Sequence, residues 1–201
     1  MSFIFTLILT LHLTTVPFLS HFQPNNTLSY TKQYAKGYVY HDKNENLSMD
    51  NNEIGIPDVY VSNGVEIVKT DKDGRYKIPV SDDAIVFVIK PRNWMTPIND
   101  LNLPQFYYIH KPNGSPTNFT FKGVDATGPL PKNINFPLYA ENGKSNFKMI
   151  VFGDPQPYSL EEVDFFSENI VSELVGVKGV EFGMTMGDIV GDNLDLLEPI
   201  N

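Results

Sequence analysis

The sequence predicts a mixed fold, in which an amino-terminal all-β sandwich is followed by the first βαβ unit of an α/β domain. Between residues 36 and 140, short apolar runs alternate with Gly, Pro, Asn and Asp at the spacing of a small sandwich. Between residues 146 and 201, two apolar runs flank a segment with helical periodicity. The polar, glycine-containing residues 140–146 separate the two patterns and predict a domain boundary.

The chain begins with an apolar run. Residues 3–19 are largely apolar over the length of a signal peptide, and the polar residues 23–26 follow. No Lys or Arg precedes the run and no Ala-x-Ala site follows it, so an uncleaved anchor and a misassigned start stay open as alternatives. We expect export to the periplasm, the cell surface or the medium. Residues 1–22 would be the signal peptide or anchor, and residues 23–35 a linker.

The next segment predicts short strands. Each combines β-branched or aromatic residues with bounding turn residues; examples are residues 37–40, 59–62, 66–69, 76–80 and 84–89. The Asp73-Gly74 pair predicts a tight turn that joins two of these strands as a hairpin. The pattern resembles the transthyretin-like or carboxypeptidase-regulatory-like sandwiches of exported proteins.

Within this segment, residues 42–53 have the spacing of a calcium-binding loop. Oxygen-bearing side chains or carbonyls fall at positions 1, 3, 5, 7, 9 and 12 of such a loop; they belong to Asp42, Asn44, Asn46, Ser48, Asp50 and Glu53. Leu47 stands at position 6, where a glycine would ease the turn, and predicted strands rather than helices flank the loop. A structural calcium site and a polar hairpin loop that needs no ion explain the pattern equally well.

The second region predicts a strand, a helix and a strand. Apolar runs begin at Lys148 and Val180, and between them Ser159 and Glu162 form a predicted capping box. Apolar residues then recur at helical spacing, at Leu160, Val163, Phe166, Ile170 and Leu174. Such a unit is a right-handed crossover between parallel strands, so both strands end at the same edge of the sheet.

Both apolar runs end in Gly-Asp, at Asp154 and Asp188. Ligands collect at the carboxyl ends of parallel strands, and two carboxylates there suggest a hard divalent metal site. A single Gly-Asp is most often an ordinary turn or a helix cap. Two of them in register, separated by a capped helix, favour the metal site. Asp192 would either orient the metal shell or cap the next helix, residues 194–197, whereas a structural role is favoured for Asn193.

At these motifs the sequence resembles the calcineurin-like metallophosphoesterases. Their first motif, Asp-x-His, reads Asp154-Pro155-Gln156 here, and their second, Gly-Asp-x-x-Asp or a close variant, is matched by residues 187–193. Residues 106–139 also look like the domain that precedes the phosphoesterase domain in exported bacterial members. The resemblance covers most of residues 36–198.

The resemblance implies hydrolysis of phosphate mono- or diesters by a water that two divalent metal ions activate. Asp154 would bind the first metal, Gln156 would replace its imidazole ligand, and Asp188 would bridge both metals as the catalytic centre. Mn, Fe, Zn and Mg are not distinguished. The family's Gly-Asn-His-Asp/Glu motif and later histidines do not occur before Asn201, so we expect a fragment, truncated early in the phosphoesterase domain, with little activity alone.

The amino-acid composition argues against some classes of binding partner and metal site. A net charge of −9 without a basic run argues against nucleic acid as a general partner. The absence of cysteine excludes disulfides and thiolate metal sites. No membrane-spanning segment is expected beyond the amino-terminal anchor, and neither substrate nor oligomeric state can be read. The alternative function is an exported β-sandwich binding or adaptor module, in which Asp154 and Asp188 serve only as turn residues.

Overall fold

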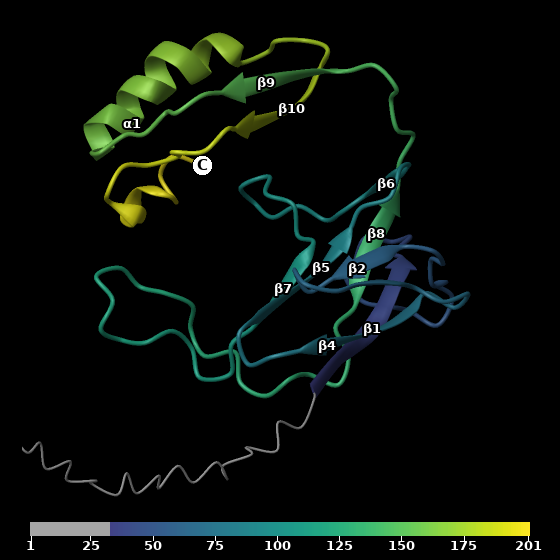
Figure 1. Cartoon of the computed structure of the whole chain (residues 1–201). Coiled ribbons are helices and arrows are strands. Elements are labelled where there is room, and N and C mark those ends of the chain that lie inside the picture. Colours follow the sequence, from purple (N-terminus) through teal and green to yellow (C-terminus); the bar gives the residue numbers. More distant parts are fainter. Residues whose placement is uncertain (1–32) are drawn as a thin grey trace, which may run out of the picture. The chain divides into compact units, whose positions relative to one another are not determined.

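The computed structural model describes residues 33–201, which are mostly β with several sheets and little helix (Figure 1). The expected signal peptide or anchor lies outside the described residues. The strands are β1 (Gln33–His41), β2 (Tyr60–Ser62), β3 (Ile67–Lys69), β4 (Arg75–Val80), β5 (Ala84–Ile89), β6 (Trp94–Met95), β7 (Tyr107–His110), β8 (Phe136–Ala140), β9 (Lys148–Phe152) and β10 (Val180–Thr185). This composition agrees with a mixed, β-rich fold. Because β1 begins at Gln33, the last residues of the expected linker belong to a strand.

Residues 33–140, called here the β-rich region, form two four-stranded sheets. Their strand orders are β4-β1-β8-β6 and β3-β2-β5-β7. In the first sheet β1 pairs antiparallel with β4 and parallel with β8. In the second sheet β5 pairs antiparallel with both β2 and β7.

Both sheets contribute to one hydrophobic core. Alternate residues of a strand point to the same face, and the buried positions follow this period along β4, at Tyr76, Ile78 and Val80. From the other sheet, Val61 of β2 and Val86 of β5 are fully buried in the same cluster. The Tyr76 hydroxyl is satisfied there, because it donates to the Ile134 carbonyl at 2.7 Å.

The Asp-Gly turn links the two sheets, so the predicted hairpin is wrong in its pairing. Strand β3 belongs to one sheet, whereas β4 pairs with β1 in the other. The turn itself is tight: Gly74 has a φ of +76°, and the Asp71 carboxylate accepts the backbone N–H groups of Asp73 and Arg75, each at 2.9 Å. The bond from Arg75 is the main cause that lowers the pKa of Asp71. Burial of the apolar face of β4 decided the pairing, since a local turn signal does not specify which strand will cover that face.

Residues 148–201, called here the strand–helix–strand region, contain the predicted parallel pair. β9 and β10 pair in parallel, with Thr185 opposite Phe152 at their carboxyl ends. Between them lies α1 (Leu160–Phe166), which runs beside β9 in Figure 1. The Phe166 ring of α1 contacts the Phe152 ring of β9, with ring centroids 5.3 Å apart.

The predicted capping box and helix form with two differences. The Ser159 hydroxyl accepts the Glu162 N–H at 3.3 Å, but the Glu162 carboxylate accepts the N–H of Tyr158 rather than that of Ser159. The α-helix ends at Phe166 and continues as a π-helical turn, Ser167–Val171, and a 3₁₀ turn, Ser172–Leu174. Side chains compete there for main-chain carbonyls, because the Asn169 amide donates to Phe165 and the Ser172 hydroxyl to Glu168.

Within residues 33–201, no helix has the length and apolar character needed to cross a bilayer.

Candidate metal centre

Three backbone hydrogen bonds join the two Gly-Asp loops. The Met186 N–H donates to the Phe152 carbonyl, the Gln156 N–H to the Asp188 carbonyl, and the Gly191 N–H to the Pro157 carbonyl, each at 2.9 Å. The first bond continues the parallel β9–β10 ladder, and the others extend it into the loops. The two motifs therefore lie side by side at one end of the strand pair, as the crossover predicted.

The backbone is strained at the predicted ligands. Asp154, Gln156 and Asp188 have φ values of +55°, +36° and +42°. Non-glycine residues rarely adopt this left-handed region, and such strain clusters at functional sites. Gly187 has a φ of +114°, which favours glycine, whereas the turn after β9 is made by Asp154 itself rather than by Gly153.

The three predicted ligand side chains are available. Asp154 and Asp188 are exposed and Gln156 is half-buried. None of the three makes a side-chain hydrogen bond or ion pair with another described residue. All three offer oxygen atoms, which suit hard divalent ions. These residues fit a metal ion as part of a ligand set; no three His, Cys, Asp or Glu side chains within residues 33–201 are grouped to hold a metal by themselves.

Asp192 and Asn193, at the end of the second motif, differ in their local roles. Asn193 is the N-cap of the 3₁₀ turn Leu194–Leu196, because its side-chain oxygen accepts the Asp195 N–H at 3.1 Å. Asp192 is exposed and does not make this cap, so the capping alternative for Asp192 is wrong. Asn193, one position later, directly precedes the turn and has the extended backbone of an N-cap residue. The alternative role of Asp192, in a metal shell, stays a prediction.

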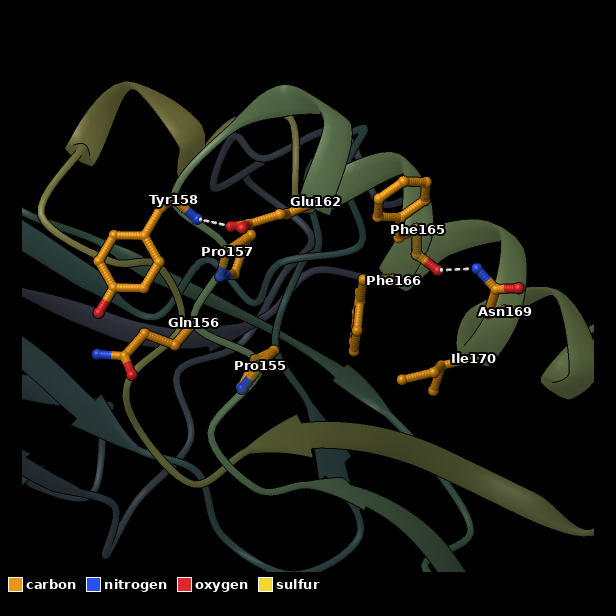
Figure 2. A pocket seen from close by; sticks show the side chains of 9 residues that line it. All are labelled: Pro155, Gln156, Pro157, Tyr158, Glu162, Phe165, Phe166, Asn169 and Ile170. Atoms are coloured by element: carbon orange, nitrogen blue, oxygen red, sulfur yellow. Dashed lines mark hydrogen bonds between the residues drawn. The ribbon is translucent and has the colours of Figure 1, made fainter.

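A depression of about 480 Å³ adjoins the first loop (Figure 2). Its lining includes Pro155, Gln156 and Pro157 from the loop, with Phe166 and Ile170 of the helical segment pointing toward them. Asp154 and Asp188 do not line it. The depression is therefore lined by one candidate ligand, Gln156, and by a mixture of apolar and polar side chains, and neither candidate carboxylate lines it.

Sequence reasoning missed the contact between Tyr158 and Gly191. A Cβ atom added at Gly191 would lie 2.4 Å from Cδ1 of Tyr158, so only glycine admits this ring. The contact fixes the second loop against the first. Nothing in the spacing of the two residues signals it, because they are neighbours only after the loops come together.

The candidate calcium loop lies in the β-rich region, between β1 and β2. Its two terminal carboxylates, Asp42 and Glu53, are buried, and Asp50 is half-buried. The remaining predicted ligands, Asn44, Asn46 and Ser48, are exposed. The loop thus turns its acidic ends inward and its middle outward.

Comparison with known proteins identifies one family model. Residues 43–125 match a family described as the N terminal of calcineurin-like phosphoesterase. The match supports a calcineurin-like phosphoesterase amino terminus, and it contains none of Asp154, Gln156 and Asp188. No curated protein matches the chain. Among solved structures, the major plantain pollen allergen Pla l 1 is 16% identical over 55% of this chain and 96% of its own, with a TM-score of 0.30.

Proposed function

We propose that the chain is the amino-terminal part of an exported phosphoesterase that hydrolyses phosphate mono- or diesters with two divalent metal ions. The family match over residues 43–125 supports the phosphoesterase class. The observation that carries the metal site is the 2.9 Å hydrogen bond from the Gln156 N–H to the Asp188 carbonyl, since it joins the two motif loops. Residues 36–140 would be a transthyretin-like or carboxypeptidase-regulatory-like sandwich, and residues 146–201 would begin the catalytic domain.

In this proposal each motif residue has a distinct task. Asp188 would be a ligand to both metals, and Asp154 and Gln156 would supply oxygen ligands to the first. Bound metals of this kind lower the pKa of a water and stabilise the charge that develops on phosphoryl oxygens. The left-handed backbone at all three positions supports a functional role for the two loops, because such strained conformations cluster at functional sites. The amide oxygen of Gln156 is a harder ligand than an imidazole nitrogen.

The export part of the proposal is supported by the apolar residues 3–19 and the polar residues that follow, all of which lie outside the described residues. Detection of the mature amino terminus by mass spectrometry, in material recovered from outside the cytoplasm, would test it.

Metal binding is the direct test of the site. Titration of the chain with Mn²⁺ in a calorimeter should give binding that Asp188→Asn weakens by more than about 100-fold, because loss of a ligand exceeds the 10- to 100-fold cost of losing an outer-shell partner. Asp164→Asn is the matched control, an exposed aspartate on α1 of the same region. In the complete protein, the same Asp188→Asn change should abolish hydrolysis of an aryl phosphate ester.

Two results would contradict the proposal. Near-wild-type hydrolysis by Asp188→Asn would exclude this residue as the shared ligand. Equal Mn²⁺ affinity in the Asp188 and Asp164 variants would leave the Gly-Asp pairs as ordinary turns, and it would favour the binding or adaptor module.

A further inference from the structure

A depression at strands β1, β3 and β4, called here the basic depression, gathers positive charge. It has a volume of about 400 Å³, and its lining includes four cationic side chains and a single carboxylate: Lys36, Lys69, Arg75, Lys77 and Asp71. Cavities of this size hold small ligands. Because the chain as a whole has a net charge of −9, this cluster of cations is opposite in sign to the protein that carries it.

Two of the lysines face each other across the β1–β4 pair. Lys36 is the register partner of Lys77 in this antiparallel ladder, and both side chains are exposed. Residues directly opposite have Cβ atoms about 5 Å apart, and like charges in such a pair destabilise a sheet. Within residues 33–201, neither lysine forms an ion pair. An anion between the two ammonium groups would offset their repulsion.

Aromatic rings position two of the cations. Lys77 Nζ lies 4.2 Å from the centroid of the Tyr34 ring. Arg75 Nε donates to the Tyr38 hydroxyl at 3.1 Å, and the guanidinium carbon lies 5.6 Å from the centroid of the same ring. A cation is attracted to the face of an aromatic ring, so these contacts restrict both long side chains. Less side-chain freedom is then lost when a ligand binds.

The acidic groups near the basic depression do not use all of its donors. Lys69 pairs with Asp58 at 3.4 Å, and Arg75 Nη1 pairs with Asp73 at 3.1 Å. The Asp71 carboxylate is engaged by the backbone N–H groups of Asp73 and Arg75. A guanidinium has five N–H donors, so Arg75 keeps donors that neither Asp73 nor the tyrosine hydroxyl uses.

We propose that the basic depression binds a dianionic phosphate group, held by the ammonium groups of Lys36 and Lys77 and the guanidinium of Arg75. Arg75 and Lys77 are two residues apart on β4, so they share the strand face that carries Lys36. A phosphate group carries a charge of about −1.5 to −2 near pH 7, whereas a carboxylate carries a single charge. The guanidinium fork matches phosphate oxygens, and lysines add point charges.

This site is separate from the candidate metal centre. None of the residues that line the basic depression belongs to either Gly-Asp loop. Phosphate binding at β1 and β4 therefore requires no metal ion, and it does not depend on the phosphoesterase proposal.

Calorimetry of the full chain in EDTA tests the proposal, because EDTA removes any metal that could hold phosphate at the Gly-Asp loops. Inorganic phosphate should bind at constant ionic strength. Lys36→Gln and Lys77→Gln should each weaken the affinity at least about tenfold, since each removes a hydrogen bond between charged groups. Lys178→Gln is the matched control, at an exposed lysine that forms no ion pair within residues 33–201, and it should bind as the wild type does.

Glycerol 3-phosphate, titrated in the same buffer, distinguishes two sources of the phosphate group. Tighter binding of glycerol 3-phosphate would identify a phosphate ester as the ligand. Tighter binding of inorganic phosphate would identify the free ion.

Charge reversal at Lys77 separates ligand binding from folding. In phosphate-free buffer, Lys77→Glu should melt higher than Lys77→Gln, because a carboxylate opposite Lys36 makes an attractive pair. Lys77→Glu should nevertheless bind phosphate more weakly than Lys77→Gln does. Wild-type phosphate affinity in Lys77→Glu would overturn the assignment of this residue. Absence of phosphate binding by the wild type in EDTA would overturn the site, as would equal affinities in Lys36→Gln and Lys178→Gln.

Discussion

The β-rich region and the strand–helix–strand region are built on different balances of forces. In the described part of the chain, every buried hydrophobic residue except Val163 and Leu196 belongs to residues 33–140. The strand–helix–strand region leaves Val151, Phe182 and Met184 of its two strands between 43% and 48% exposed. Burial of apolar surface stabilises the first region, whereas main-chain hydrogen bonds and a helix cap contribute most of the order in the second.

The comparison also separates the two candidate sites. The candidate calcium loop includes carboxylates that the β-rich region buries. Ion binding at this loop should therefore raise the stability of that region. The predicted metal site consists of exposed carboxylates held by strained backbone, in a region with few buried residues. Functional loops are commonly drawn from the less stable parts of a fold.

Truncation of core side chains should give the largest difference between the regions. Ile78→Ala, at a fully buried position of β4, should lower the free energy of unfolding by about 2–5 kcal/mol, because it leaves a cavity in the shared core. Met184→Ala in β10, at a 43% exposed position, should cost less than about 1 kcal/mol. Urea denaturation followed by circular dichroism measures both.

A second truncation within the β-rich region serves as the control. Ile85→Ala removes the same side chain as Ile78→Ala from a strand position that is 49% exposed, so its effect should be close to that of Met184→Ala. Equal losses at Ile78 and Met184 would break the comparison, because burial would then not distinguish the regions.

Removal of the Tyr76 hydroxyl should have the next largest effect. Tyr76→Phe leaves the Ile134 carbonyl without its 2.7 Å partner in the core and should cost about 1–3 kcal/mol. Tyr60→Phe, at a 46% exposed ring, is the control and should be nearly neutral.

The same variant makes a pH prediction. Burial raises the pKa of Tyr76, so its contribution to stability is complete below the ordinary tyrosine value of about 10 and is lost as the pH rises above it. Above the ordinary tyrosine pKa of about 10, the melting temperature of the wild type should therefore fall more steeply with pH than that of Tyr76→Phe. If the melting temperatures of the two proteins fall in parallel as the pH rises, ionisation of Tyr76 is not the cause of the loss of stability at high pH.

Loss of the helix cap should have the smallest effect and should be local. Ser159→Ala removes the acceptor of the Glu162 N–H and should destabilise α1 by about 1 kcal/mol. Amide hydrogen exchange at Glu162 should become faster, while exchange in β1 is unchanged. Ser159→Thr keeps a hydroxyl acceptor and should exchange nearly as the wild type does. A simultaneous loss of protection in β1 would mean that the two regions unfold together.

Local sequence patterns predicted an element correctly where a single local effect, such as burial of one strand face or a helix cap, determines it. Alternating apolar residues gave the strands around Val39, Val61, Ile78 and Val86, because burial of one strand face follows the period of two. The Ser159 cap gave the start of α1. The helix was nevertheless interrupted after Phe166, since the Asn169 and Ser172 side chains bond to main-chain carbonyls that periodicity does not consider.

The sequence predicted the positions of some candidate site residues correctly and those of others incorrectly. The parallel crossover correctly brought Asp154 and Asp188 to one end of a strand pair, and their metal roles stay predictions. The cap at Asn193, in place of Asp192, depended on the geometry of a single turn.

The sequence by itself determined the position of several strands, the start of α1 and the loops that carry candidate oxygen ligands, because propensity, period and capping act over a few neighbouring residues. The tertiary structure alone decided that β4 pairs with β1 instead of β3, that β1 pairs in parallel with β8, and that Tyr158 packs against Gly191. These choices join residues far apart in the chain. They are set by which surfaces bury the most apolar area together, and no local window of sequence contains both surfaces.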